Sequence, residues 1–248
     1  MKKLITIADW AADGLACQEV RTAVQGFLRA PTERDISFVP STPSTIHAGY
    51  LARQVVETED QYGQPLNTVV LVDVQSPAEL LIIRLKSGIH VLGPHTGNVF
   101  SFLLSTIEEV FTYPGLKIDS HFPARDAYAR VAAHLMESLQ DEMELEEGHL
   151  SLIPGVQDHY IGPIDSYGNI KTTIQESTLK EKYSYGDEID VSIHETRKKV
   201  QFVSNPSSRD AGRLVIFPGA SGDNHDPLLE IADWGDDAVS PGMKIKYS

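Results

Sequence analysis

Cysteine is almost absent from this sequence. Cys17 is the only one in 248 residues, so the chain can form neither an internal disulfide nor a cysteine-based metal site. The nine histidines are scattered without the spacing that metal ligands show, and we expect no metal ion. Also missing are the phosphate-binding Gly-x-x-x-x-Gly-Lys-Ser/Thr loop, the His-Glu-x-x-His motif and the Gly-x-Ser-x-Gly motif. Any chemistry must therefore come from other polar groups.

Positive charge and long apolar runs are equally scarce. The formal net charge of −14 disfavours nucleic acids and anionic membranes, since both bind basic surfaces. No apolar run approaches the length that spans a bilayer. Asp9 and Asp13 interrupt the N-terminal segment where a signal peptide needs its apolar core. We expect a cytoplasmic protein with no nucleic-acid or membrane partner.

The first part of the chain alternates between two periodicities. Continuous apolar runs predict buried strands, and apolar residues at helical spacing predict helices between them. The predicted strands are residues 4–8, 36–39, 68–74, 79–85 and 89–92, and the predicted helices are residues 14–30, a segment opened by 42–44, 100–110 and 124–139. Such alternation is typical of an α/β domain with a mainly parallel sheet, which we place at residues 1–153.

The character of the sequence changes after about residue 155. Short strand-like runs follow, separated by Gly, Asp, Asn and Pro, with little helical periodicity. They are residues 160–164, 170–174, 188–193, 200–203, 214–217, 228–232 and 243–247. This spacing predicts a small all-β domain, a barrel or a sandwich, over residues 156–248.

Two carboxylates lie at the ends of predicted buried strands. Asp9 follows the first strand, and Asp73 lies near the end of the third. Ligands of parallel sheets gather at the carboxyl ends of the strands, where acidic side chains commonly hold ribose hydroxyls or ammonium groups. A carboxylate at such a place can instead cap the next helix. The sequence leaves both roles open for each residue.

A third carboxylate lies in a predicted tight turn of the second domain. Asp165 and Asn169 flank Ser-Tyr-Gly, and both Gly and Asn tolerate the positive φ that hairpin turns require. Either the two side chains hold the turn through bonds to its backbone, or they face a ligand that carries an amine or an amide.

The order of these motifs resembles the S-adenosyl-L-methionine hydroxide adenosyltransferase family, which includes the fluorinases and chlorinases. Residues 164–174 (Ile-Asp-Ser-Tyr-Gly-Asn-Ile-Lys-Thr-Thr-Ile) are similar to the family's most specific motif, Ile-Asp-Arg-Phe-Gly-Asn-Leu-Ile-Thr-Asn-Ile. Its other motifs are matched more loosely, by residues 8–10, 70–73, 93–97, 122–126, 131–135 and 229–232 with Gly235 and Ala238.

The resemblance implies an α/β domain followed by a β-barrel domain, in a homotrimer whose nucleoside sites each lie between two subunits. It implies substrate-binding roles for Asp9 on the ribose diol, Asp165 on the methionine ammonium group and Asn169 on the adenine edge. Tyr167 belongs to the same binding turn, and Asp73 is the implied catalytic residue. The implied reaction is displacement at the C5′ carbon of S-adenosylmethionine, which gives adenosine and methionine if water attacks. S-adenosylmethionine is the substrate, and no further cofactor is implied.

The sequence departs from the family where water is activated. The hydrolytic members hold the water with an Asp, an Arg and a His, but here Leu80 stands at the Arg position and Pro123 at the His position. Residues 73–77 (Asp-Val-Gln-Ser-Pro) also replace the family's Asp-Pro-Gly-Val-Gly.

Substitutes for the missing groups are available in the sequence. His121, His95 and Arg84 lie near the altered motifs, and none of them is shown by the sequence to act there. Three hypotheses follow: an enzyme with altered handling of the nucleophile, a nucleoside-binding protein without catalysis, and an enzyme for another adenosyl substrate. We favour the first.

Overall fold

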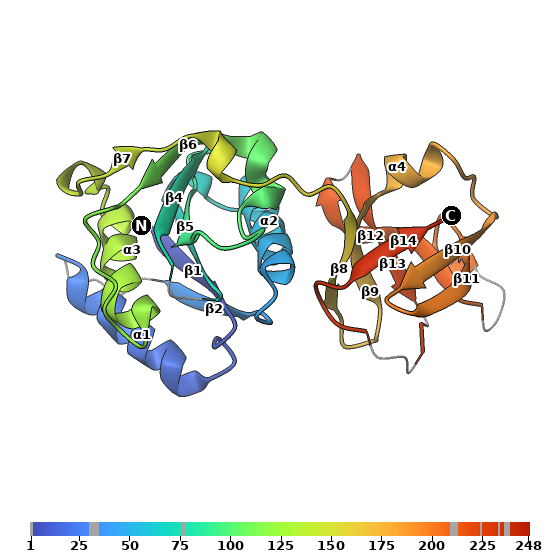
Figure 1. Ribbon diagram of the computed structural model, residues 1–248, viewed down its shortest axis with the longest axis horizontal. Helices are drawn as coiled ribbons and strands as arrows, with labels where there is room; N and C mark the ends of the chain where they lie inside the picture. The colour runs from blue at the N-terminus through green and yellow to red at the C-terminus, as the bar shows by residue number, and fades with distance from the viewer. Residues whose placement is uncertain are drawn as a thin grey trace. The chain divides into compact units, whose positions relative to one another are not determined.

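A seven-stranded sheet organises the first part of the chain, and a closed barrel of seven strands forms the second (Figure 1). The computed structural model describes residues 2–29, 35–75, 78–208, 213–223, 225–232, 234–235 and 239–248. These residues divide into unit 1, Met1–Gly155, and unit 2, Val156–Ser248. The structure is therefore a mixed α/β sheet unit followed by a barrel. Ser76, Pro77 and Ala238, which belong to the compared motifs, lie outside the described residues.

Half of the sheet in unit 1 is parallel. Its full strand order is β2-β1-β3-β5-β4-β6-β7. The parallel strands are β1 (Lys3–Ala8), β2 (Ile36–Pro40), β3 (Thr68–Asp73) and β5 (His90–Pro94). Ala8 pairs with Pro40 on one side and with Asp73 on the other, so the carboxyl ends of β1, β2 and β3 meet at one edge.

The other half of the sheet is antiparallel. It consists of β4 (Leu80–Leu85), β6 (Ile107–Thr112) and β7 (Glu146–Glu147), with β4 paired to β5. The expectation of a mainly parallel sheet is wrong here, because a tight turn with Gly88 at φ +90° returns the chain beside β4. Residues 100–110 do not form the predicted helix: a 3-10 helix, η2 (Ser101–Thr106), leads into β6, whose β-branched residues suit an extended backbone.

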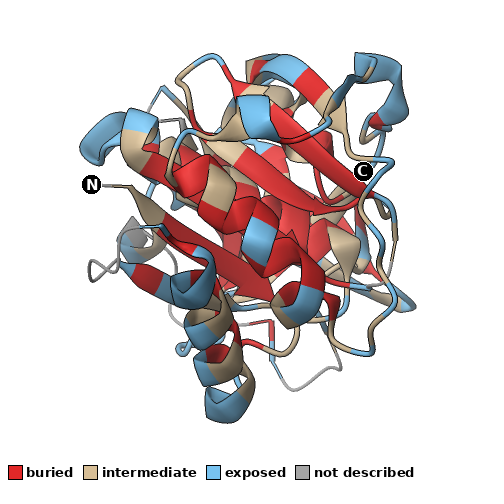
Figure 2. Cartoon of the chain, turned by 90° about the vertical axis from the view of Figure 1, so that its left-hand side faces the viewer, coloured by how far each residue is buried: buried red, intermediate tan, exposed pale blue. Residues whose placement is uncertain are grey.

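Helices cover both faces of the sheet (Figure 1), and in Figure 2 the helices nearest the viewer carry buried residues (red) on one side and exposed residues (pale blue) on the other. On one face α1 (Gly14–Phe27) packs with α3 (Ala129–Met136), which the π-helix η3 (Ala124–Tyr128) precedes, and on the other lies α2 (Thr45–Tyr62). The shorter helices of unit 1 are η1 (Pro65–Asn67), η4 (Gln140–Glu142) and η5 (Leu150–Leu152). In the described part of the chain, no helix is long and apolar enough to cross a membrane.

Unit 2 closes in the strand order β10-β11-β12-β13-β9-β8-β14. Its strands are β8 (His159–Ile164), β9 (Ile170–Gln175), β10 (Glu188–Ile193), β11 (Thr196–Phe202), β12 (Val215–Asp223), β13 (Asp226–Ala232) and β14 (Lys244–Tyr247), and its helices are α4 (Glu176–Lys180) and η6 (Pro206–Ser208). Every predicted strand of this region is confirmed, with ends shifted by a few residues. Alternate strand residues fill the barrel with an apolar core.

Candidate functional site

The carboxylate of Asp73 is buried at the carboxyl edge of the sheet in unit 1. Its side chain is 3% exposed, and the indole Nε1 of Trp10 donates a hydrogen bond of 2.7 Å to its Oδ2. Trp10 follows β1 by two residues, and Asp73 pairs with the last residue of β1. The strand register therefore brings this donor to this acceptor.

An aromatic cluster fixes the Trp10 indole. Its ring centroid lies 6.0 Å from that of Phe38 and 5.2 Å from that of Phe122, at interplanar angles of 61° and 89°. Edge-to-face pairs of this kind hold a ring in place. Residues far apart in the sequence thus meet around Asp73. Trp10 was not predicted to have this positioning role, although an aromatic residue directly after a strand-end Asp was a usable signal.

Helix capping does not explain Asp9 or Asp73. The N-cap of α1 is Asp13, whose side chain accepts a hydrogen bond from the Leu15 N–H, and the first described element after β3 is a strand. Asp9 is half-buried, and no described residue donates a hydrogen bond to its side chain. The structure thus removes the capping alternative for both residues.

The positions that differ from the family are apolar and buried. Leu80 is 1% exposed, and Pro123 is buried directly after Phe122, which packs on Trp10. Neither side chain can exchange a proton. Leu80 begins β4 opposite Pro94, whereas Arg84 lies opposite His90 at the other end of the strand, roughly 13 Å away at the usual rise per residue. Arg84 is therefore not a substitute at this edge.

The two histidines considered as substitutes have other surroundings. Nε2 of His95 lies 2.9 Å from the carbonyl oxygen of Leu152 and must carry the proton of that hydrogen bond. His121 is exposed. No described contact joins either ring to Asp73.

The segment after Asp73 carries backbone strain. Gln75 has φ +55°, a conformation that favours glycine, and the family motif has a glycine in this segment. The Gln75 Nε2 donates a hydrogen bond of 2.9 Å to the carbonyl oxygen of Pro43, at the start of α2. Strain of this kind is common at functional sites, and here it lies two residues from Asp73.

A buried histidine lies where β2 leads into α2. His47 is 6% exposed, and its Nδ1 accepts a hydrogen bond of 3.1 Å from the Thr42 N–H. Burial lowers the pKa of His47 to about 4, so the ring is neutral at pH 7 with its proton on Nε2. No described residue accepts a hydrogen bond from Nε2. The ring stabilises the loop that ends β2.

In unit 2, the turn between β8 and β9 is held by its own side chains. Oδ1 of Asp165 accepts hydrogen bonds from the backbone N–H groups of Tyr167 (2.8 Å) and Asn169 (2.9 Å), and Oδ2 accepts one from Asn169 Nδ2 (2.9 Å). Gly168 supplies the positive φ, +81°. Partial burial would raise the pKa of Asp165, but these hydrogen bonds outweigh it and lower the pKa. The turn-holding role is thus present in the structure.

One residue of this turn projects away from the barrel. Tyr167 is 90% exposed, which leaves nearly its whole ring open to a ligand or a partner.

Among the described residues, no three His, Cys, Asp or Glu side chains lie close enough together to hold a metal ion.

Comparison with known proteins shows the fold. No protein-family model matches this sequence, and no curated protein matches it significantly. The structure is similar to that of an uncharacterized conserved protein from Thermotoga maritima, with a TM-score of 0.75 and 18% identity over 99% of this chain and 100% of that one. It is also similar to a conserved hypothetical protein from Thermus thermophilus, with a TM-score of 0.66 and 18% identity over the full length of both chains.

Proposed function

We propose that this chain binds S-adenosyl-L-methionine and displaces methionine from its C5′ carbon. The observation that carries the proposal is the pair of carboxylates at the ends of neighbouring strands, Asp9 after β1 and Asp73 at the end of β3. Asp9 offers acceptors to a ribose diol, since no described donor occupies them. Trp10 holds Asp73 through its hydrogen bond, and we assign this carboxylate to the side of the reacting carbon.

The main task of the protein in this reaction is to position the nucleophile and the C5′ carbon in line. A nucleophile attacks C5′ in line, the C5′–S bond breaks, and its electron pair passes to the sulfonium, which leaves as neutral methionine. If water attacks, the new O–C5′ bond releases one proton, and Asp73 is the group that accepts it. The site must align the water and strip it of other solvent. The aromatic cluster around Trp10 supplies an apolar surface for that purpose.

The turn of unit 2 completes the proposed site from a neighbouring subunit of a homotrimer. Asp165 binds the methionine ammonium group, Asn169 the adenine edge, and the exposed Tyr167 ring packs against the ligand. These roles rest on the motif in residues 164–174. They require Asp165 to accept a hydrogen bond from the ligand in addition to those of the turn, which a carboxylate with about four lone-pair sites allows.

A second candidate function is binding without cleavage. Leu80 and Pro123 favour it, because both are buried and neither can activate water. An enzyme for another adenosyl compound would use the same ribose and adenine contacts. Measurement of products from S-adenosylmethionine separates these candidates from the first.

Titration calorimetry with S-adenosylmethionine and with adenosine tests the binding site. Asp9→Asn is expected to weaken adenosine binding by about tenfold or more, since it removes the charged acceptor of the ribose diol. Asp13→Asn is the matched control, because it removes the same charge four residues away while Asn still caps α1. No heat with either ligand, or equal losses in both variants, would contradict the proposal.

A further inference from the structure

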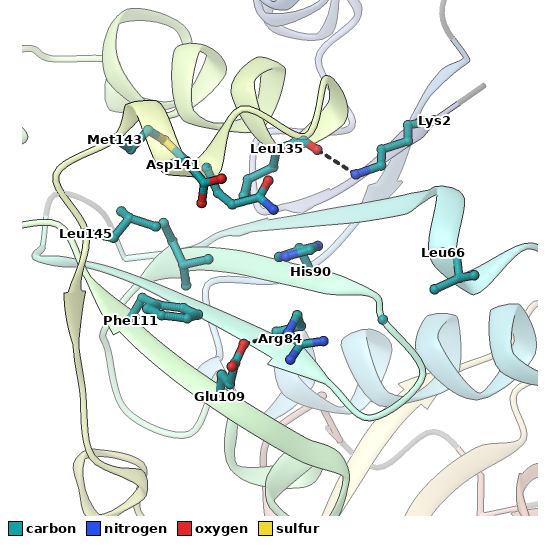
Figure 3. Close-up of a pocket in the computed structure, with 13 residues that line it drawn as sticks. Lys2, Leu66, Arg84, His90, Glu109, Phe111, Leu135, Asp141, Met143 and Leu145 are labelled. Carbon is teal, nitrogen blue, oxygen red and sulfur yellow. Dashed lines mark hydrogen bonds and ion pairs between the residues drawn. The ribbon is translucent and has the colours of Figure 1, made fainter.

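A cavity in unit 1 lies where β1 and β5 begin, at the opposite end of the parallel strands from Asp73 (Figure 3). Its volume is about 600 Å³, within the range of small-molecule sites. Lys2, directly before β1, and His90, the first residue of β5, line it. Asp9 lies seven residues along the chain from Lys2, so the two sites are roughly 20 Å apart at the usual rise of a strand. The cavity plays no part in the proposed nucleoside site.

The ammonium group of Lys2 faces this cavity without a carboxylate partner. Lys2 is half-buried, and its Nζ donates one hydrogen bond, of 2.9 Å, to the carbonyl oxygen of Leu135. No described carboxylate forms an ion pair with it. Burial lowers the pKa of Lys2, as expected for a cation whose charge is poorly compensated. An ammonium group has three donors, so two remain for a ligand.

The other cation of the cavity is already neutralised. The guanidinium of Arg84 forms ion pairs with Glu109 at 2.5 Å and with Glu108 at 3.2 Å. Figure 3 shows Arg84 and Glu109 together on one side of the cavity and Lys2 on the other. Of these two cations, Lys2 is therefore the one whose charge is available to pair with an anion.

His90 lies between these two sides in Figure 3. Burial first, and then the positive charges of Lys2 and Arg84, lower the pKa of His90 to about 4, against the opposing charge of Glu109. The ring is thus neutral at pH 7 and can donate or accept one hydrogen bond.

The remaining walls are largely apolar, and the charge at the rim is negative. Phe111, Met143 and Leu145 form one wall, and Leu66, which is 72% exposed, lies at the mouth. Asp141 also lines the cavity. Its charge opposes a second negative charge on a ligand.

We propose that this cavity binds a small monocarboxylate with an apolar body. The carboxylate accepts hydrogen bonds from the two remaining donors of Lys2 and from His90, and the apolar body packs against Phe111 and its neighbours. Inorganic phosphate and dicarboxylates fit poorly, because Asp141 repels a second charge and the apolar walls stay uncovered. The proposal does not rest on S-adenosylmethionine binding.

Titration calorimetry with 3-phenylpropionate at pH 7 tests this site in the full chain, with any purification tag at the C-terminus. 3-Phenylpropan-1-ol, 3-phenylpropylamine and inorganic phosphate serve as the uncharged, cationic and purely ionic comparisons. Saturable binding of the acid is expected, with the alcohol about tenfold weaker and no detectable binding of the amine or of phosphate. Bound acid is also expected to raise the pKa of His90, which histidine NMR titration measures.

Variants locate the binding. Lys2→Met should weaken binding of 3-phenylpropionate about tenfold, and Lys2→Arg should retain most of the affinity. Lys86→Met is the matched control, because Lys86 also donates to a carbonyl oxygen, that of Ser105, and does not line the cavity. S-adenosylmethionine binding should be unchanged in all three variants. Equal affinity for acid and alcohol, equal losses in Lys2→Met and Lys86→Met, or no saturation by about 10 mM acid would overturn the proposal.

Discussion

The indole Nε1 of Trp10 donates a hydrogen bond of 2.7 Å to Oδ2 of Asp73, and this bond joins the ends of two neighbouring strands. A hydrogen bond to a buried carboxylate stabilises both the fold and the charged form of the acid. It therefore links the stability of the sheet edge to the group proposed to act on water.

Trp10→Phe removes the hydrogen bond to Asp73 and keeps the packing of the ring. It therefore measures what the bond contributes to stability and to cleavage. Phenylalanine keeps an aromatic ring against Phe38 and Phe122 but has no donor for Asp73. We expect the free energy of unfolding to fall by about 1–3 kcal/mol, and the rate of S-adenosylmethionine cleavage to fall more than its affinity. Urea unfolding and product analysis measure these quantities. Asp73→Asn, whose amide oxygen still accepts from Trp10, should keep more of the stability and lose the cleavage. If Trp10→Phe were as stable as the wild type, the hydrogen bond between Trp10 and Asp73 would not stabilise the fold.

Asp165→Asn distinguishes the two roles of the β8–β9 turn. Its Oδ1 can still accept from the N–H groups of Tyr167 and Asn169, while the Asn169 amide can turn over to face the new Nδ2. Stability should stay within about 1 kcal/mol of the wild type, whereas S-adenosylmethionine affinity should fall about tenfold, because the ammonium group loses its counter-charge. Asp165→Ala should lose both. Unchanged affinity in Asp165→Asn would leave the residue with the turn-holding role alone.

Acid should destabilise unit 1 through His47. Its pKa is about 4 in the folded protein and ordinarily 6.5, so between these values the unfolded chain binds more protons. The contribution of His47 to the free energy of unfolding is complete above pH 6.5 and is lost as the pH falls toward 4. Between pH 7 and pH 5 this loss is on the order of 2 kcal/mol. His90 acts in the same direction.

Urea unfolding at the two pH values measures this dependence. In His47→Asn the side-chain oxygen can still accept from the Thr42 N–H but does not titrate. The variant should therefore show a smaller loss of stability on acidification than the wild type. An identical loss in both proteins would contradict the assignment.

Gln75 tests the strain in the loop after Asp73. Gln75→Gly relieves the cost of φ +55° but gives up the hydrogen bond to Pro43. These terms oppose each other at about 1 kcal/mol each, so we expect a change close to zero. Gln75→Val should cost about 2 kcal/mol, since a β-branched residue is disfavoured at positive φ and valine also lacks the amide. Thermal unfolding of the two variants measures the difference. Equal stability of Gln75→Gly and Gln75→Val would contradict the claim that the backbone at Gln75 is strained.

Local patterns were enough to predict the barrel and the first five strands of the sheet. Most are apolar runs bounded by Gly, Asp, Asn or Pro, and the structure gives a strand at each. They failed at residues 107–110, where apolar spacing suits a helix as well as a strand. The pairing of β6 with β4 decides between them, and pairing is a tertiary contact that a single window of sequence does not contain.

The candidate sites divide in the same way. Asp9, Asp73 and Asp165 were predictable because a carboxylate at a strand end or in a turn is a local signal. The bond between Trp10 and Asp73 depends on strand register, and the cavity of Lys2 and His90 depends on two strands beginning at the same edge. Neither relationship is visible before the order of strands in the sheet is known.

The most direct test of the proposed function is chromatographic measurement of adenosine and methionine after incubation with S-adenosylmethionine. The wild type is predicted to form both products in equal amounts above the rate in buffer, and Asp73→Asn is predicted to form neither above that rate. Formation of no product by the wild type, with binding intact, would contradict cleavage and leave a nucleoside-binding protein.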